Sequence, residues 1–186
     1  MLDAQKSLQE NFNEIIGQLK RAVADKKHPF RFLTFCTVSP NIKPEARNVV
    51  LRSVTGQNTF VIYTDVRSQK VASLKSNPIC SLFFWHPQQK VQVSFTAKTE
   101  LHSNSKLATH LDEFSARQYN CKQEPGAVIN RPADAWEFDN ERTVENFCEI
   151  HCSLIEVDIL KLQKNGHIRM KGSKSTGSWN FNWIAP

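Results

Sequence analysis

Two short segments place cations and hydroxyls next to apolar runs, and they are the first candidates for chemistry. In residues 47–52 the cations Arg47 and Arg52 flank an apolar core, and in residues 63–70 an apolar run leads into a helix start that carries Lys70. Such groups suit a phosphate, whose negative charge needs several donors, including free N–H groups at a helix N-terminus. Taken singly, Arg47 and Lys70 are more simply explained as solvated surface charges.

A third candidate is the neutral amide of Gln92, which stands in the middle of the apolar segment 90–95. A buried amide must find partners, and one with both a donor and an acceptor can bind the edge of a heteroaromatic ring. Taken alone, a solvent-facing strand glutamine is the simpler interpretation. The sequence contains no Gly-rich dinucleotide motif, P-loop or G-x-S-x-G elbow that would indicate another chemistry.

The elements that must position these residues begin with a helix. Apolar residues recur at spacings of three and four over residues 3–26, which predicts an amphipathic helix that ends before Pro29. The pattern then changes to short runs rich in β-branched and aromatic residues, which is typical of strands. We expect strands at residues 30–39, 46–54, 58–64, 79–86, 90–101, 147–162, 167–171 and 179–184.

Two further helices and a long loop interrupt these strands. Residues 67–76 are predicted to form a short helix, and residues 105–119 a longer one with Leu107, Leu111 and Phe114 on one side. Residues 120–145 have little periodicity, so we expect a long loop, which at this length is often functional or mobile. The C-terminal segment 147–186 is predicted to be strands joined by a hairpin turn.

This order predicts one mainly β (α+β) domain over residues 1–186. Six to eight mostly antiparallel strands with few helices indicate a small β-barrel, with the N-terminal helix and the other helices at its periphery. A chain of 186 residues is long enough to bury a core and short enough that one domain is expected.

The overall charge and hydropathy exclude some partners. The net charge of +6 favours an anionic partner, but the basic residues are dispersed and have no RNP-like or zinc-finger spacing, so nucleic acid is disfavoured. No apolar run approaches the roughly 18 residues of a membrane span, and the N-terminal residues lack the apolar core of a signal peptide. We therefore expect a cytoplasmic protein that is not bound to a membrane.

The five cysteines form an odd set without CxxC pairs, and all except Cys121 lie in strand-like runs. Such thiols behave as small buried hydrophobes, so we expect them to be reduced. Cys148, His151 and Cys152 could suggest a metal site, but on a strand their side chains would point to both faces. No metal is expected.

The order and spacing of the candidate segments resemble the pyridoxamine 5'-phosphate oxidase family. From Arg47 to about Leu101 the chain reads R-x-V-V-L-R, then F-V-I-Y-T-D-x-x-S-x-K-x-x-x-L-x-x-N-P-x-x-x-L-x-F-x-W-H, then Q-V, similar to that family's FMN-binding half. The closing V-D-I-L-K-L, H-I-R-M and W-N-F-N-W-I-A-P resemble its C-terminal region. The N-F-C segment before the C-terminal strands is similar to a broader oxidase-related subfamily rather than to the true oxidases.

The resemblance implies a split β-barrel homodimer that holds FMN at its interface and performs redox chemistry on an unidentified small molecule. It assigns the phosphate to Arg47 and Lys70, with Ser68 and Arg67 beside them, the flavin and ribityl chain to Asn48, Val49, Val50, Leu51 and Arg52, and the phosphate end to Tyr63 and Thr64. Gln92 would bond the pyrimidine edge of the flavin from the other subunit. Arg169 would stabilise the anionic reduced ring. His167 would be the substrate-side acid or base, although an exposed hairpin histidine without a catalytic task is an equal alternative.

The departures from the family pattern bear on the substrate. The usual S-R-K reads Ser68-Gln69-Lys70 here, which removes a cation that Arg67 could replace. The R-L-H-D-R of the true oxidases reads N-G-H-I-R at residues 165–169, so the arginine that covers the substrate is missing, and Leu160 stands at or near the position of an expected tryptophan. Arg117, Gln123 and Arg131 are loose candidates for a substitute anion site. The sequence therefore supports binding of the FMN cofactor better than binding of the vitamin substrate. Two alternatives stay open: a non-enzymatic flavin or haem carrier or sensor, and a deazaflavin in the same groove.

Overall fold

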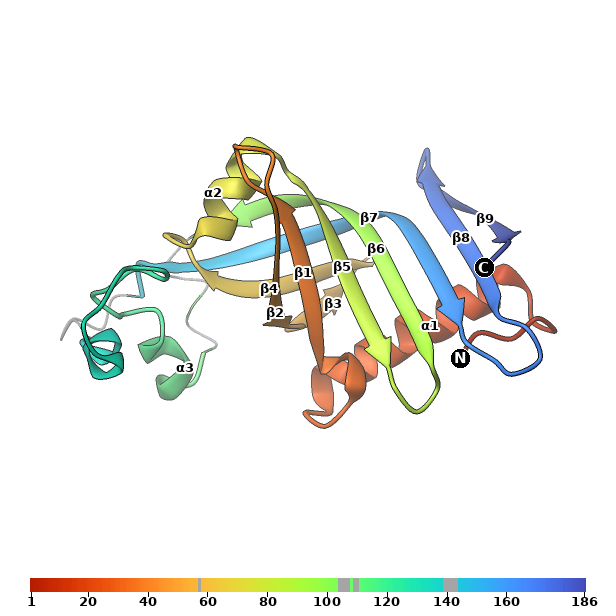
Figure 1. Ribbon diagram of the computed structural model, residues 1–186, viewed down its shortest axis with the longest axis horizontal. Coiled ribbons are helices and arrows are strands. Elements are labelled where there is room, and N and C mark those ends of the chain that lie inside the picture. The colour runs from red at the N-terminus through yellow and green to blue at the C-terminus, as the bar shows by residue number, and fades with distance from the viewer. Residues whose placement is uncertain (57, 104–107, 109–110, 139–143) are drawn as a thin grey trace.

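The computed structural model describes residues 1–56, 58–103, 108, 111–138 and 144–186, in which nine strands form one sheet (Figure 1). The helices are α1 (Leu8–Ala24), α2 (Gln69–Ser76) and α3 (Glu113–Arg117), with 3-10 turns at Pro29–Arg31 and Pro132–Trp136. The strands are β1 (Phe32–Val38), β2 (Pro44–Val50), β3 (Ser53–Thr55), β4 (Thr59–Asp65), β5 (Ile79–His86), β6 (Val91–His102), β7 (Phe147–Lys161), β8 (Ile168–Ser175) and β9 (Ser178–Ile184). Every pairing among them is antiparallel, and the fold is the predicted mainly β barrel with peripheral helices.

Helix α1 is shorter than the predicted 3–26 because its caps stop it at both ends. Ser7 forms a capping box with Glu10, and the N–H of Asp25 closes the C-terminus on the carbonyl of Arg21. Residues before Ser7 fold back instead, since the N–H of Asp3 donates to Asn11 Oδ1 over 2.8 Å. The apolar face of α1 enters the core, where Phe12 packs against the β9 aromatics Trp179 and Phe181.

The sheet closes on itself through the step from β2 to β3. Its strand order is β2-β1-β5-β6-β7-β4-β3, so two strands that follow one another in the chain lie at opposite ends of the order. At the step, the N–H of Leu51 donates to Arg31 O over 3.0 Å, and the N–H of Arg52 donates to Val61 O over 2.9 Å. The chain thus leaves β1 and joins β4, which divides the predicted strand 46–54 into two and raises the strand number to nine in the described chain.

Strand β7 is where the barrel splits. One of its edges pairs with β6 along its length, while the other pairs with β4 over residues 147–153 and with β8 over residues 156–161. The β6–β7 register shifts between Thr96 and Ala97, opposite this change of partner. Figure 1 shows the result, with β8 and β9 standing away from β3 and β4.

The core on the inner face of the sheet is rich in phenylalanine side chains. Phe60, Phe84 and Phe95 are fully buried and meet edge to face, with ring centroids 5.1–6.1 Å apart. Such contacts favour one arrangement of the sheet. No helix within the described residues is both long and apolar enough to cross a membrane.

The prediction for residues 105–119 was wrong in its described part. The described residues there hold one α-helix, Glu113–Arg117, capped by Asp112, and Phe114 is 76% exposed instead of packing inward. Residues 104–107, with Leu107 of the predicted apolar face, and 109–110 lie outside the described residues. The predicted loop 120–145 holds the turn Pro132–Trp136 and a bridge between Cys121 and Phe138, and its residues 139–143 are not described.

Candidate functional site

The register of the sheet places the predicted site residues on two different faces. Arg47 pairs with Phe35, whose side chain is in the core, so Arg47 points to the inner side of the sheet. Gln92 lies between the buried Val91 and Val93 and pairs with the exposed Trp85, so it points outward. Within one chain the two candidate groups therefore face opposite ways.

On the inner side, the cation Lys70 lies beside two hydroxyls, and the cation Arg47 is near enough for its charge to act on Lys70. Lys70 Nζ donates to Thr64 Oγ1 over 2.9 Å, and Thr64 Oγ1 lies 3.1 Å from Ser68 Oγ. The two hydroxyls are buried, and Ser68 is the N-cap of α2 without using its side chain as a cap. We refer to Arg47, Thr64, Ser68 and Lys70 as the phosphate cluster, after the role that the sequence predicts for them.

The charges of the phosphate cluster interact. The pKa of Lys70 is lowered, first by burial and then by the positive charge of Arg47. Two part-buried cations that repel each other favour an anion between or beside them. The cluster could therefore accept a negatively charged group.

Glu45, which sequence reasoning missed, supplies one such group. Its carboxylate accepts from Arg47 Nη2 over 2.9 Å and from Gln69 Nε2 over 2.6 Å. Glu45 precedes Arg47 by two residues on β2, so strand periodicity puts both on one face, and that spacing was the signal available in the sequence.

Arg67 binds elsewhere. Its guanidinium pairs with Asp65 over 2.7 Å and donates to the carbonyls of Cys121 and Lys122 over 2.8 and 3.2 Å. It thus anchors the segment after α3 to the end of β4. The prediction that Arg67 replaces the missing cation beside Lys70 is not supported by these contacts.

Residues 48–52 divide between faces and core. Asn48 is exposed on the outer face and accepts from Thr34 Oγ1 over 3.2 Å, and Val50 pairs there with Phe32. Val49 packs against the core, and Leu51 is fully buried in it. The side chain of Leu51 completes the core at the step between β2 and β3, so this residue could line a cofactor only through its backbone.

Arg52 and Tyr63 form an aromatic corner near the C-terminal end of β4. The Arg52 guanidinium lies 5.3 Å from the centroid of the Tyr63 ring, which in turn meets Phe147 edge to face. Burial raises the pKa of Tyr63, so its hydroxyl stays protonated at neutral pH. The corner can hold a neutral polar group or stack beside an aromatic one.

The outer face brings Gln92 and Arg169 together. Both line a cavity of about 280 Å³ with polar side chains of β6, β7 and β8. Arg169 is held there by Asp158, with Nε–Oδ1 and Nη2–Oδ2 distances of 2.9 and 2.8 Å, and this pairing raises its pKa. Asp158 was not predicted, and its cross-strand place next to Arg169 depends on a register that the sequence does not show.

His167 lines a neighbouring cavity of about 460 Å³ with Trp85 and Lys90. Its side chain is exposed in the turn before β8, and its Nδ1 accepts from the N–H of Gln163 over 3.1 Å. The proton of the neutral ring is then on Nε2. Since Trp85 pairs with Gln92, the two outer cavities adjoin along the sheet.

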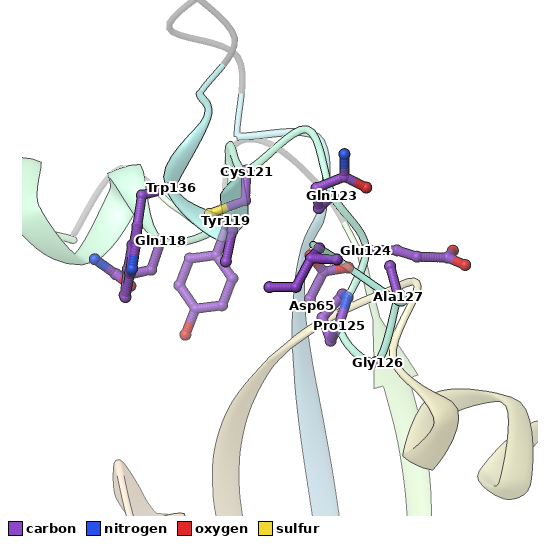
Figure 2. Close-up of a pocket in the computed structure, with 12 residues that line it drawn as sticks. Asp65, Gln118, Tyr119, Cys121, Gln123, Glu124, Pro125, Gly126, Ala127 and Trp136 are labelled. Atoms are coloured by element: carbon purple, nitrogen blue, oxygen red, sulfur yellow. The ribbon is translucent and has the colours of Figure 1, made fainter. Parts of the chain in front are cut away.

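A third cavity, of about 310 Å³, lies between residues 118–136 and the end of β4 (Figure 2). Figure 2 shows Tyr119 and Trp136 on one side of it and Asp65 and Pro125 on the other. Of the loose anion-site candidates only Gln123 lines this cavity. Arg117 instead lies over the ring of Phe138 at 4.1 Å, and Arg131 pairs with Asp134 at 3.0 Å, so the three do not form one anion site.

All five cysteines are free thiols in the structure. Cys80, Cys148 and Cys152 are buried, whereas Cys36 and Cys121 are half-buried. Burial raises the pKa of the Cys36 and Cys148 thiols, which keeps them in the unreactive protonated form. In the described part of the chain, no three His, Cys, Asp or Glu side chains are grouped to hold a metal ion.

Comparison with known proteins identifies several curated relatives that share one name. The curated pyridoxine/pyridoxamine 5'-phosphate oxidase of Nocardioides sp. is 32% identical over 80 residues, which cover 42% of this chain and 36% of that protein. The enzyme of the same name from Actinobacillus succinogenes is 34% identical over 101 residues, covering 54% and 43%. The matched regions thus span less than half the length of these relatives.

Two solved structures share the fold along almost the whole chain. A pyridoxamine 5'-phosphate oxidase-related, FMN-binding protein from Nostoc punctiforme superposes with a TM-score of 0.78 at 19% identity, covering 98% of this chain and 100% of that one. PhzG from Burkholderia lata, solved with tetrahydrophenazine-1-carboxylic acid, also gives 0.78, at 14% identity and coverage of 100% and 98%. At these identities the likeness establishes the split-barrel fold.

The family model for the FMN-binding domain of pyridoxamine 5'-phosphate oxidase matches residues 11–103, half of the 186-residue chain. That segment contains the whole phosphate cluster and Gln92, whereas Arg169 and His167 lie beyond it. With the fold and this match in agreement, the chain belongs to the pyridoxamine 5'-phosphate oxidase family of FMN-binding domains.

Proposed function

We propose that this chain binds FMN, with the flavin phosphate at the phosphate cluster, and that it is an oxidoreductase acting on a small molecule. The observation that carries the proposal is the hydrogen bond of Lys70 to the buried Thr64 hydroxyl, with the Ser68 hydroxyl beside it and the charge of Arg47 acting on Lys70. The family match supports FMN as the ligand with that phosphate.

The chemistry of the cluster fits a phosphate monoester. Two cations and two hydroxyls supply several donors, and charge-assisted hydrogen bonds to phosphate are the strong ones. An anion beside Lys70 opposes the burial and the repulsion from Arg47 that lower its pKa. Phosphate binding and protonation of Lys70 therefore favour each other.

The outer face of the sheet would bind the flavin ring. The Gln92 amide offers a donor and an acceptor to a heteroaromatic edge, and Arg169, fixed by Asp158, keeps a cation in the same cavity. When bound, FMN supplies the hydride and electron transfer itself. The residues of the chain orient the partners, stabilise negative charge near Arg169 and can exchange a proton at His167.

We further propose a homodimer, because the phosphate cluster and Gln92 face opposite sides of one sheet. A ligand that contacts both needs the cluster of one protomer and the outer face of another, which a two-fold axis provides. The outer face has the apolar surface that such an interface needs, with Phe32 60% and Trp85 40% exposed.

Light scattering should therefore report about twice the 21.3 kDa chain mass. Phe32→Glu should lower the mass towards that of one chain and weaken FMN binding together, because it places a charge in the interface. Val128→Glu, at a fully exposed position, is the control and should change neither. A strict monomer that binds FMN tightly would contradict the shared site.

The test of the proposed function is titration of the apo-protein with FMN, followed by the change in flavin absorbance and fluorescence. We expect saturation at one FMN per chain. Purified protein that carries haem or a deazaflavin and does not take up FMN would contradict the proposal and favour a carrier or sensor on the same fold.

A further inference from the structure

The carboxylate of Glu45 accepts hydrogen bonds from Arg47 of the phosphate cluster and from the neighbouring Gln69. Glu45 and Arg47 share the inner face of β2, and the side chain of Glu45 is only 11% exposed. Its Oε2 accepts from Arg47 Nη2 over 2.9 Å, while Arg47 Nη1 donates to Thr37 Oγ1 over 2.7 Å. One edge of the guanidinium therefore already holds an anion.

Helix α2 directs a further donor at the same carboxylate. Gln69 Nε2 donates to Glu45 Oε1 over 2.6 Å, while the Ser73 hydroxyl, 3.4 Å from Oε2, donates to the carbonyl of Gln69 over 3.0 Å. Donors from β2 and α2 thus converge on one oxyanion, which is the arrangement by which a protein binds a phosphate. Here an internal carboxylate receives them.

The charges around the cluster show what this carboxylate does to a ligand. Arg47 and Lys70 provide two positive charges, and the carboxylate of Glu45 neutralises that of Arg47. The negative charge of Asp65, at the end of β4, also acts on Lys70 and raises its pKa, but Asp65 is already paired with Arg67. An incoming phosphate therefore meets less positive charge than the two cations alone would offer.

We propose that Glu45 is an internal anion that competes with the ligand phosphate for Arg47, so that its charge sets how strongly the site prefers a phosphorylated flavin over an unphosphorylated one. The inference rests on the proposed function, in which the phosphate lies at Arg47 and Lys70. It assigns Glu45 a role in specificity, and it predicts that removing this charge improves binding.

The test compares FMN with riboflavin, which lacks the phosphate, in the wild type and in Glu45→Gln. Glutamine keeps the size and an acceptor for Arg47 but removes the charge. We expect Glu45→Gln to bind FMN about tenfold more tightly, which corresponds to roughly 1.4 kcal/mol of binding free energy. The affinity for riboflavin should change less than about twofold, because riboflavin has no phosphate to compete with the carboxylate. Glu113→Gln, an exposed glutamate on α3, makes the same charge change and should alter neither affinity.

A second variant guards against a folding defect in Glu45→Gln. Glu45→Ala removes the carboxylate together with its hydrogen bonds to Arg47 and Gln69, and it should also raise the preference for FMN. Unchanged or weaker FMN binding in both folded variants would overturn the role of Glu45. A wild-type protein that binds FMN no better than riboflavin would instead overturn the placement of the phosphate, so the two failures are distinguishable.

Discussion

Replacing Arg47 or Lys70 with alanine is expected to weaken FMN binding by about 1.5–3 kcal/mol each, which is the usual worth of a hydrogen bond to a charged group. This corresponds to a loss of roughly ten- to 150-fold in affinity. Both side chains are part-buried, Lys70 where it donates to Thr64 Oγ1 and Arg47 where it donates to Thr37 Oγ1, so solvent screens them little. Titration of each folded apo-variant with FMN measures the effect.

Two controls separate phosphate binding from a general loss of structure. Lys75→Ala removes an exposed cation from the same helix and should leave FMN affinity unchanged. Riboflavin affinity should be nearly equal in the wild type and in Arg47→Ala, because riboflavin lacks the group that Arg47 binds. Unchanged FMN affinity in both Arg47→Ala and Lys70→Ala would remove the phosphate from this cluster.

The FMN-loaded protein is expected to be a poor pyridoxamine 5'-phosphate oxidase, although its curated relatives carry that name. A phosphorylated vitamin needs cations for its own phosphate, and a site without the charged partner loses several kcal/mol of discrimination. The turn before β8 presents the uncharged, exposed Asn165 and Gly166 where the resemblance expects an arginine. Arg117 and Arg131 do not compensate, because they bind Phe138 and Asp134.

Formation of pyridoxal 5'-phosphate, followed at its aldehyde absorbance, measures this activity. We expect trace conversion, well below the turnover of about 1 s⁻¹ or more that is ordinary for a dedicated enzyme. Turnover at that ordinary level would show that the missing arginine is not needed. Trace conversion directs the search to other small molecules and electron acceptors.

Local patterns were enough to predict most of the sheet. Period-two alternation and the turn residues gave the strands from 79 to 101 and from 147 to 184 to within a few residues, except that β8 runs on to Ser175. The break at Leu51 could not be predicted this way, because the chain changes its hydrogen-bonded partner there without a change in side-chain pattern. The helix over 105–119 failed in its described part for a related reason, since Phe114 has helical spacing but no surface to cover.

The candidate site was predicted unevenly. Arg47, Lys70, Thr64 and Ser68 follow from residue types near a helix start and from the family resemblance, and the structure brings them together. Ion pairs that depend on register or on distant loops were not visible, and they decide the roles of several residues. These pairs are Glu45 with Arg47, Arg67 with Asp65 and Arg169 with Asp158.

The measurement that tests the account most directly is the paired titration of wild-type apo-protein with FMN and riboflavin under the same conditions. We predict that FMN saturates at one per chain and binds much more tightly than riboflavin, because only FMN carries the phosphate that Arg47 and Lys70 hold. Equal affinities for the two flavins, or no uptake of FMN at all, would contradict the assignment of this cluster to the flavin phosphate.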